Sequence, residues 1–187
     1  MIKAWRWVGR YMHHPDPPAA AMNRVAMVIG WNTPLYPLYL LAMPGTGLFP
    51  AGWLTLSATP LFLAVPAVMR RSALAGRLLM PAVGAANSVF GVWVMGPASG
   101  TTLFLLPCAI LAALLHRPAE LHWRLAVLAF VAAAYLLCVS DVLHPLTKLA
   151  PETSAAIFRL NGFSLVCLMA FLALVFAPLM EPGPAKR

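Results

Sequence analysis

Long apolar stretches alternate with short polar or proline- and glycine-rich segments along most of this chain. A helix needs about 20 residues to span about 30 Å of hydrocarbon, and most of these stretches approach or exceed that length. We expect membrane spans at about 21–43, 51–69, 78–96, 101–115, 125–143 and 155–179. The pattern therefore predicts an all-α fold, an integral membrane bundle of six transmembrane helices within residues 19–180.

The first residues follow a different pattern, that of an amphipathic helix. Apolar side chains recur every three or four residues at Ile2, Trp5, Val8 and Met12, and basic residues lie on the opposite face of the helix. A basic amphipathic helix with Trp on its apolar side lies in the head-group layer instead of crossing the membrane. Three prolines between positions 15 and 18 end this helix. We expect residues 1–18 to form a cytoplasmic interfacial segment and residues 181–187 a cytoplasmic tail.

Composition agrees with a membrane protein. Of the 187 residues, 61% are hydrophobic and 10% are charged, whereas a soluble domain has about 25% charged residues. Six spans leave no room for a separate soluble domain. The sequence therefore predicts one membrane domain.

The positive charges indicate how that domain is oriented. On the six-span prediction only Lys148 and Arg159 fall outside, because short basic loops stay in the cytoplasm. This predicts a multi-pass protein of the bacterial inner membrane with both termini cytoplasmic. The net charge of +8 then reflects insertion and contact with membrane lipid, so we expect no nucleic-acid partner. The other eleven Lys and Arg residues are Lys3, Arg6, Arg10, Arg24, Arg70, Arg71, Arg77, Arg117, Arg124, Lys186 and Arg187.

Two spans have features that affect packing. The first contains the sequence Trp31-Asn32-Thr33-Pro34, which predicts a break in the helix near the middle of the membrane. The third carries Gly84 and Ser88 at the spacing that lets helix backbones approach closely in lipid. We expect the third and sixth spans to pack at the centre of the bundle.

Polar residues at the outer ends of the fifth and sixth spans form one candidate ligand site. Charged groups near hydrocarbon face protein, a partner or a water-filled cavity. Asp141 and Arg159 are expected at similar depth and could pair. The set is either a pocket open to the outside or a salt bridge that joins two helices. Its members are Asp141, His144, Glu152, Arg159 and Asn161.

A second candidate site lies near the middle of the membrane. Asn32 and Thr33 lie beside the expected break in the first span, and Asn87 is expected at similar depth in the third span. Broken helices line substrate sites in many transporters, whereas polar groups between spans also serve as ordinary interhelical hydrogen bonds. Both interpretations remain open at this point.

No catalytic set is evident in the sequence. The string Gly96-Pro97-Ala98-Ser99-Gly100 misses the G-x-S-G of rhomboid proteases by one residue, and the last span has no His. None of the five His residues lies inside a predicted span, so haem ligation across the bundle is not expected. We predict no catalytic residues and no cofactor, and the sequence leaves a metal site undetermined.

The layout resembles the hexahelical membrane domains that precede bacterial nucleotide cyclases and other signalling modules. The resemblance rests on the amphipathic start, six tightly connected helices, both ends inside, and a last span that opens with Phe158-Arg159-Leu160-Asn161-Gly162-Phe163. It implies a membrane receptor or a dimerising anchor. Only Met180 to Arg187 follow the last span, so we expect the output to come from a partner.

Two functions follow from these observations. The first is a non-enzymatic receptor-like, sensory or anchoring membrane domain with a polar pocket open to the outside. It would act as a homodimer or through a separate signalling protein. The alternative is a small permease with its site around the broken first span. A permease needs a polar path that links both faces, whereas a receptor needs only a cavity that its ligand can enter.

Overall fold

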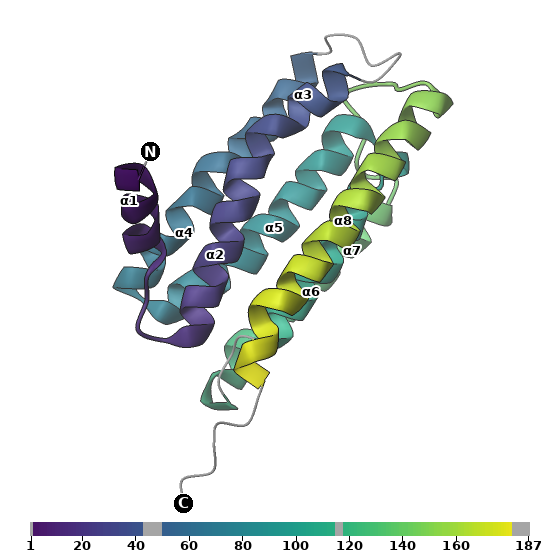
Figure 1. The fold of residues 1–187 in the computed structure, drawn as a ribbon. Coiled ribbons are helices and arrows are strands. Elements are labelled where there is room, and N and C mark those ends of the chain that lie inside the picture. Colours follow the sequence, from purple (N-terminus) through teal and green to yellow (C-terminus); the bar gives the residue numbers. More distant parts are fainter. Residues whose placement is uncertain (1, 43–49, 115–117, 181–187) are drawn as a thin grey trace, which may run out of the picture.

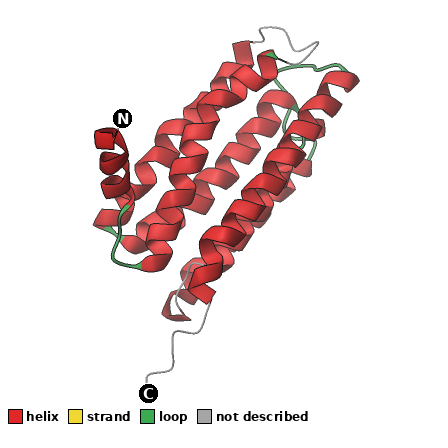
Figure 2. Ribbon diagram, in the orientation of Figure 1, coloured by secondary structure: helices red, strands yellow, loops and turns green. Residues whose placement is uncertain are grey.

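The computed structural model describes residues 2–42, 50–114 and 118–180. These residues form helices joined by short loops, with no strand among them (Figure 2). The all-α prediction is therefore confirmed for the described part of the chain.

The helices follow one another up and down a single bundle (Figure 1). The first half contains α1 (Ile2–Met12), α2 (Pro17–Asn32), α3 (Tyr36–Leu41), α4 (Thr59–Arg71) and α5 (Ala73–Met95). The second half contains α6 (Leu105–Leu114), α7 (Leu121–Val139) and α8 (Pro151–Met180). Short 3₁₀ segments precede α3, α4, α6 and α7, at Thr33–Leu35, Pro50–Ala58, Thr101–Phe104 and Pro118–Glu120, and a further one follows α5 at Pro97–Ser99.

Four helical segments are long and apolar enough to cross a membrane. They are Gly52–Arg71, Ala73–Met95, Leu121–Val139 and Pro151–Leu179. The segment Thr101–Leu114 is apolar but shorter, and the first predicted span is divided between α2 and α3. The helices lie close to the predicted positions, whereas the number of crossings stays a prediction.

The predicted break in the first span is present. The α-helix ends at Asn32, the 3₁₀ turn Thr33–Leu35 follows, and α3 begins at Tyr36. Pro34 and Pro37 supply no backbone amide hydrogen, which removes α-helical hydrogen bonds in this region. The Thr33 hydroxyl donates to the carbonyl of Ile29 at 2.8 Å. At the break the Asn32 side chain is exposed and the Thr33 side chain is half-buried.

The central helix is α5, which packs against α2, α4, α6 and α7. Gly84 permits the close approach of α6, because a Cβ atom there would lie 2.6 Å from Sγ of Cys108. Ser88 donates to the carbonyl of Gly84 at 3.0 Å and so needs no partner on another helix. Gly84 of the third span therefore lies where α5 and α6 approach closely, as the sequence predicted.

The expectation that α8 is central is wrong. Only 11% of its most apolar 18-residue stretch is buried, and Phe163 and Leu174 are 69% and 75% exposed. This helix contacts α2 near one end of the bundle and the segment 97–104 near the other. Because α8 is apolar on all sides, its sequence does not indicate which face packs. Its exposed apolar side chains are suited to hydrocarbon.

The two ends of the bundle differ in charge. We call the end that holds Arg70, Arg71 and Arg77 the basic end, and the end that holds Gly96 and Gly100 the far end. At the basic end α1 packs beside α4, where the Tyr11 hydroxyl donates to the carbonyl of Leu63 at 2.7 Å. The amphipathic helix is therefore present, and its position in a membrane stays a prediction.

Candidate functional site

A cavity of about 590 Å³ lies between α2 and α8, and α5 and α6 form its floor. Figure 1 shows α5 behind the space that separates α2 from α8. The volume falls within the range of about 300–1,000 Å³ that is typical of small-molecule sites. The cavity exists because α8 packs against its neighbours toward its two ends and stands away from α5 between them.

A chain of hydrogen bonds lies at the far end of the cavity. The Tyr36 hydroxyl donates to Oδ1 of Asn161 at 3.1 Å, and Nδ2 of Asn161 donates to the carbonyl of Ser99 at 2.8 Å. The Ser99 and Thr101 hydroxyl groups lie 3.1 Å apart. Asn161 is fully buried. These bonds join α3, α8 and the turn after α5, and they hold the polar groups in fixed positions.

Two further amide side chains line the cavity, one from α2 and one from α5. Asn32 at the end of α2 and Asn87 in α5 both line it. Within the described residues neither side chain has a hydrogen-bond partner. Asn32 is exposed and Asn87 is half-buried, so both amides are accessible to a partner that fills the cavity and hydrogen-bonds to them. Thr33 also lines the cavity, although its hydroxyl is already bonded to Ile29.

The lining of the cavity carries no charged side chain among the described residues. Its half toward the far end contains amides and hydroxyls. Its half toward the basic end is formed by Val25, Phe62, Met80, Leu111, Phe171 and Leu172. The cavity therefore suits an uncharged molecule with one polar and one apolar end.

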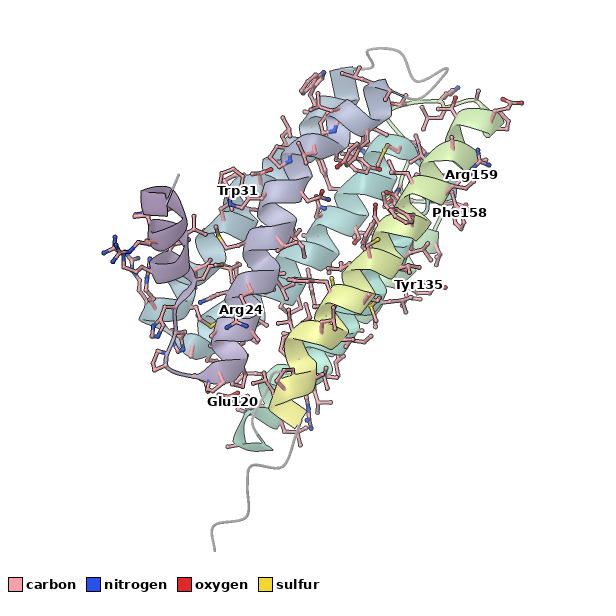
Figure 3. The ribbon with its side chains drawn as sticks, viewed as in Figure 1. Arg24, Trp31, Glu120, Tyr135, Phe158 and Arg159 are labelled. Atoms are coloured by element: carbon pink, nitrogen blue, oxygen red, sulfur yellow. The ribbon has the colours of Figure 1, made fainter. Side chains whose placement is uncertain are left out.

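The structure divides the first predicted site. Asn161 lines the cavity, whereas Asp141, His144, Glu152 and Arg159 are exposed at the far end. No ion pair joins Asp141 to Arg159 among the described residues, so the suggested pair does not form. Figure 3 shows Arg159 projecting from the outside of α8. A ligand-binding role for these four residues stays a prediction.

The second predicted set is brought together. Asn32, Thr33 and Asn87 line the same cavity as Asn161. Sequence reasoning treated the two sets as rival sites because it could not tell how α8 is rotated about its axis. It also missed Tyr36, which lies one turn beyond Asn32 in the broken first span and is the link between α3 and α8.

A buried ion cluster at the basic end was also missed. Arg77 is only 3% exposed, and its guanidinium lies 2.6 Å from Oε1 of Glu120 and 3.4 Å from Oδ2 of Asp16. The cluster joins α5 to the loop before α2 and to the turn before α7. The signal available in the sequence was that three of only five acidic residues, Asp16 and Glu120 among them, lie among the basic residues of this side.

Comparison with known families supplies the remaining observation. Residues 12–186 match the profile of MASE7, a family of membrane-associated sensory domains. The chain belongs to the MASE7 family. No curated protein and no solved structure matches it. This MASE7 chain is accordingly a membrane sensory domain made of apolar helices, in agreement with the sensory interpretation of the sequence.

Metal binding has no visible basis in the described part of this MASE7 domain. No group of three His, Cys, Asp or Glu side chains there is placed to hold a metal ion. Cys108 and Cys138 are buried thiols within the helix packing, and Cys167 is exposed on α8. The cavity is therefore the candidate site that the geometry supports best.

Proposed function

We propose that this MASE7 domain is a receptor of the bacterial inner membrane that binds a small ligand in the cavity between α2 and α8. The observation that carries the proposal is a pair of amides, Asn32 and Asn87, that line a cavity of about 590 Å³ and have no hydrogen-bond partner among the described residues. Polar groups without partners are costly inside a membrane domain and mark functional positions there. A ligand that forms hydrogen bonds with both amides binds more tightly than a ligand of similar shape that does not.

We also propose that the first span and the segment Thr101–Leu114 cross the membrane together with the four long apolar helices, with the basic end in the cytoplasm. The first span would comprise α2, the 3₁₀ turn and α3, and the fourth would be Thr101–Leu114. Short basic segments stay on the cytoplasmic side, which supports this orientation. Both termini then lie in the cytoplasm, where a separate signalling protein or a second copy of the chain receives the signal.

The position of α8 suggests how binding is transmitted. At the basic end Leu172 and Phe176 belong to the same buried cluster as Met22 of α2. Near the far end α8 is joined to α3 through Asn161 and Tyr36. An occupant between these two contacts changes the separation of α8 from α2. Because α8 is a continuous helix, its cytoplasmic end moves as well.

Double electron–electron resonance, which measures the distance between two spin labels, tests this proposal. Ser72 and Ala177 are exposed near the basic end, on the α4–α5 turn and on α8, and take the labels after replacement by Cys. The native Cys residues are replaced by Ala, and the protein is placed in lipid nanodiscs. The variant Ser164→Trp fills the cavity from α8, whereas Val166→Trp adds the same side chain on the lipid-exposed side.

We expect Ser164→Trp to shift the distance distribution between positions 72 and 177, and Val166→Trp to leave it unchanged. We expect this shift because the Trp side chain occupies the space of the ligand and holds α8 away from α5. Identical distributions for the two variants would contradict the proposal.

The permease alternative uses the same cavity and is supported by the same three residues, Asn32, Thr33 and Asn87. It requires access to the cavity from both faces. The buried cluster that includes Met22, Met69 and Phe176 lies between the cavity and the basic end. In the variant Asn87→Cys, made with the native Cys residues replaced by Ala, labelling of position 87 by a membrane-impermeant maleimide from both sides of the membrane would favour a permease over a receptor.

A further inference from the structure

The mouth of the cavity lies on the flank of the bundle. Val28 of α2 is 46% exposed and Phe163 of α8 is 69% exposed, and both line the cavity. Asn32 and Cys167, also in the lining, are exposed beside them. At the far end the Tyr36–Asn161 hydrogen bond closes the space between α3 and α8. Under the proposed topology this flank faces lipid, so the ligand reaches the cavity from the bilayer.

The chemistry of the lining restricts what can enter by that route. Among the described residues the lining supplies amides and hydroxyls but no charged side chain. A charged group at this depth carries a cost of about 2.5–3.5 kcal/mol on insertion scales unless a counter-charge is present. An uncharged polar group incurs a smaller cost, which the amides of Asn32 and Asn87 offset by hydrogen bonding.

The positions of the polar and apolar lining residues also determine how a ligand is oriented along the bundle. Asn87 lies fourteen residues after Ala73, about 21 Å along α5 from the basic end. The apolar half extends from there toward Leu172. Along α8 the lining runs from Leu160 to Leu172, about 18 Å at the helical rise per residue. An elongated molecule fits with its polar group in the outer half of the membrane and its chain toward the cytoplasm, as in an outer-leaflet lipid.

We infer that the ligand is an uncharged amphipathic lipid with a hydroxyl- or carbonyl-bearing head group, which enters sideways between α2 and α8. Its head group contacts Asn32 and Asn87, and its chain lies against Met80, Leu111 and Phe171. This inference rests on the proposed receptor function and names the class of its ligand.

Photocrosslinking tests the inference in the full chain. The protein is placed in nanodiscs of phosphatidylethanolamine and phosphatidylglycerol. The probe is a monoacylglycerol with a diazirine in its acyl chain, and peptides that carry the crosslink are identified by mass spectrometry. The matched competitors are the unlabelled monoacylglycerol and the fatty acid of the same chain at pH 8, where the fatty acid is anionic in the bulk phase.

We expect labelling of α8 residues 168–172 to saturate and to be displaced by monoacylglycerol but not by the fatty acid. Asn87→Leu keeps a similar volume and removes the amide, so half-saturation should require about tenfold more probe. Ser164→Trp should abolish this labelling, and Val166→Trp should not affect it. Asn87→Leu keeps the test informative even if the larger Trp disturbs folding.

Labelling that rises without saturation and spreads over the exposed faces of α7 and α8 would overturn the inference, because bulk lipid labels in that way. Equal displacement by the fatty acid would also overturn it. The spin-label distances separate this failure from failure of the receptor proposal. If Ser164→Trp still shifts the distances while the probe does not saturate, the receptor proposal stands and the lipid class is wrong. Saturable labelling without a distance shift supports the lipid class and contradicts the receptor proposal.

Discussion

The Tyr36 hydroxyl lies 3.1 Å from Oδ1 of Asn161, and this hydrogen bond joins the broken first helical segment to the last helix. The two residues are 125 positions apart in the chain. The bond lies at the far end of the cavity, where Asn161 also donates to the carbonyl of Ser99. It fixes one end of α8 while the middle of α8 stands away from α5.

The first prediction concerns the strength of this link. Asn161→Leu leaves the Tyr36 hydroxyl and the Ser99 carbonyl without their partner in an apolar environment. We expect it to lower the free energy of unfolding by about 1–3 kcal/mol, and Tyr36→Phe to lower it by about 1 kcal/mol. Unfolding by dodecyl sulfate titration in mixed micelles measures both. Tyr135→Phe, at an exposed tyrosine of α7 (Figure 3), is the control and should change little. Equal losses for Tyr36→Phe and Tyr135→Phe would contradict the role assigned to the bond.

The second prediction concerns the ion cluster at the basic end. Arg77→Met leaves Asp16 and Glu120 close together without the cation that lies between them. Removing one partner of a buried ion pair costs about 3–5 kcal/mol, and partial exposure of the two carboxylates places the expected loss at the lower end. Arg71→Met removes an exposed charge at the same end and should stay within about 0.5 kcal/mol of the original protein. The same titration compares them, and equal stabilities would show that the cluster is not structural.

The third prediction concerns helix packing at Gly84. A methyl group there would lie 2.6 Å from Sγ of Cys108, so Gly84→Ala should destabilise the protein by about 1–3 kcal/mol. The double variant Gly84→Ala with Cys108→Ala should recover part of that loss because it removes the opposing sulfur atom and keeps a good helix former in α6. At Gly162 in α8 an added methyl group meets nothing within 4 Å. Gly162→Ala should therefore be neutral or slightly stabilising, since Ala favours helix over Gly by about 1 kcal/mol. Similar effects at both glycines would contradict the packing described for α5 and α6.

The fourth prediction concerns orientation in the membrane. Ser72 and His144 are exposed at opposite ends of the bundle. In a background without other Cys, a membrane-impermeant maleimide should label His144→Cys in cells whose inner membrane is intact and whose outer membrane is permeable. Ser72→Cys should react only after the inner membrane is opened. Labelling of both positions from the same side would show that the proposed crossings are wrong.

The positions of the helices could be predicted from the sequence because apolar length and proline content determine them locally. The break after Asn32 is an example, since Pro34 and Pro37 cannot supply the amide hydrogens that a continuous helix needs. The close approach at Gly84 was predictable for the same kind of reason, because it depends on the size of one side chain.

Which residues line the cavity could not be predicted in this way. It depends on how each helix is rotated about its axis, and α8 is apolar on all sides, so no polar stripe indicates its buried face. Asn161 faces Tyr36 while its near neighbour Arg159 is exposed. Asp16 and Glu120 stand among several basic residues, and the sequence does not indicate that Arg77 is the one they enclose, because its burial follows from the folding of both around it.

The central claim is that the content of the cavity sets the position of α8 at the basic end. The distance distribution between spin labels at positions 72 and 177 tests this claim most directly. A shift with Ser164→Trp that Val166→Trp does not produce is the predicted result. The same distribution in both variants and in the parent protein would contradict the claim.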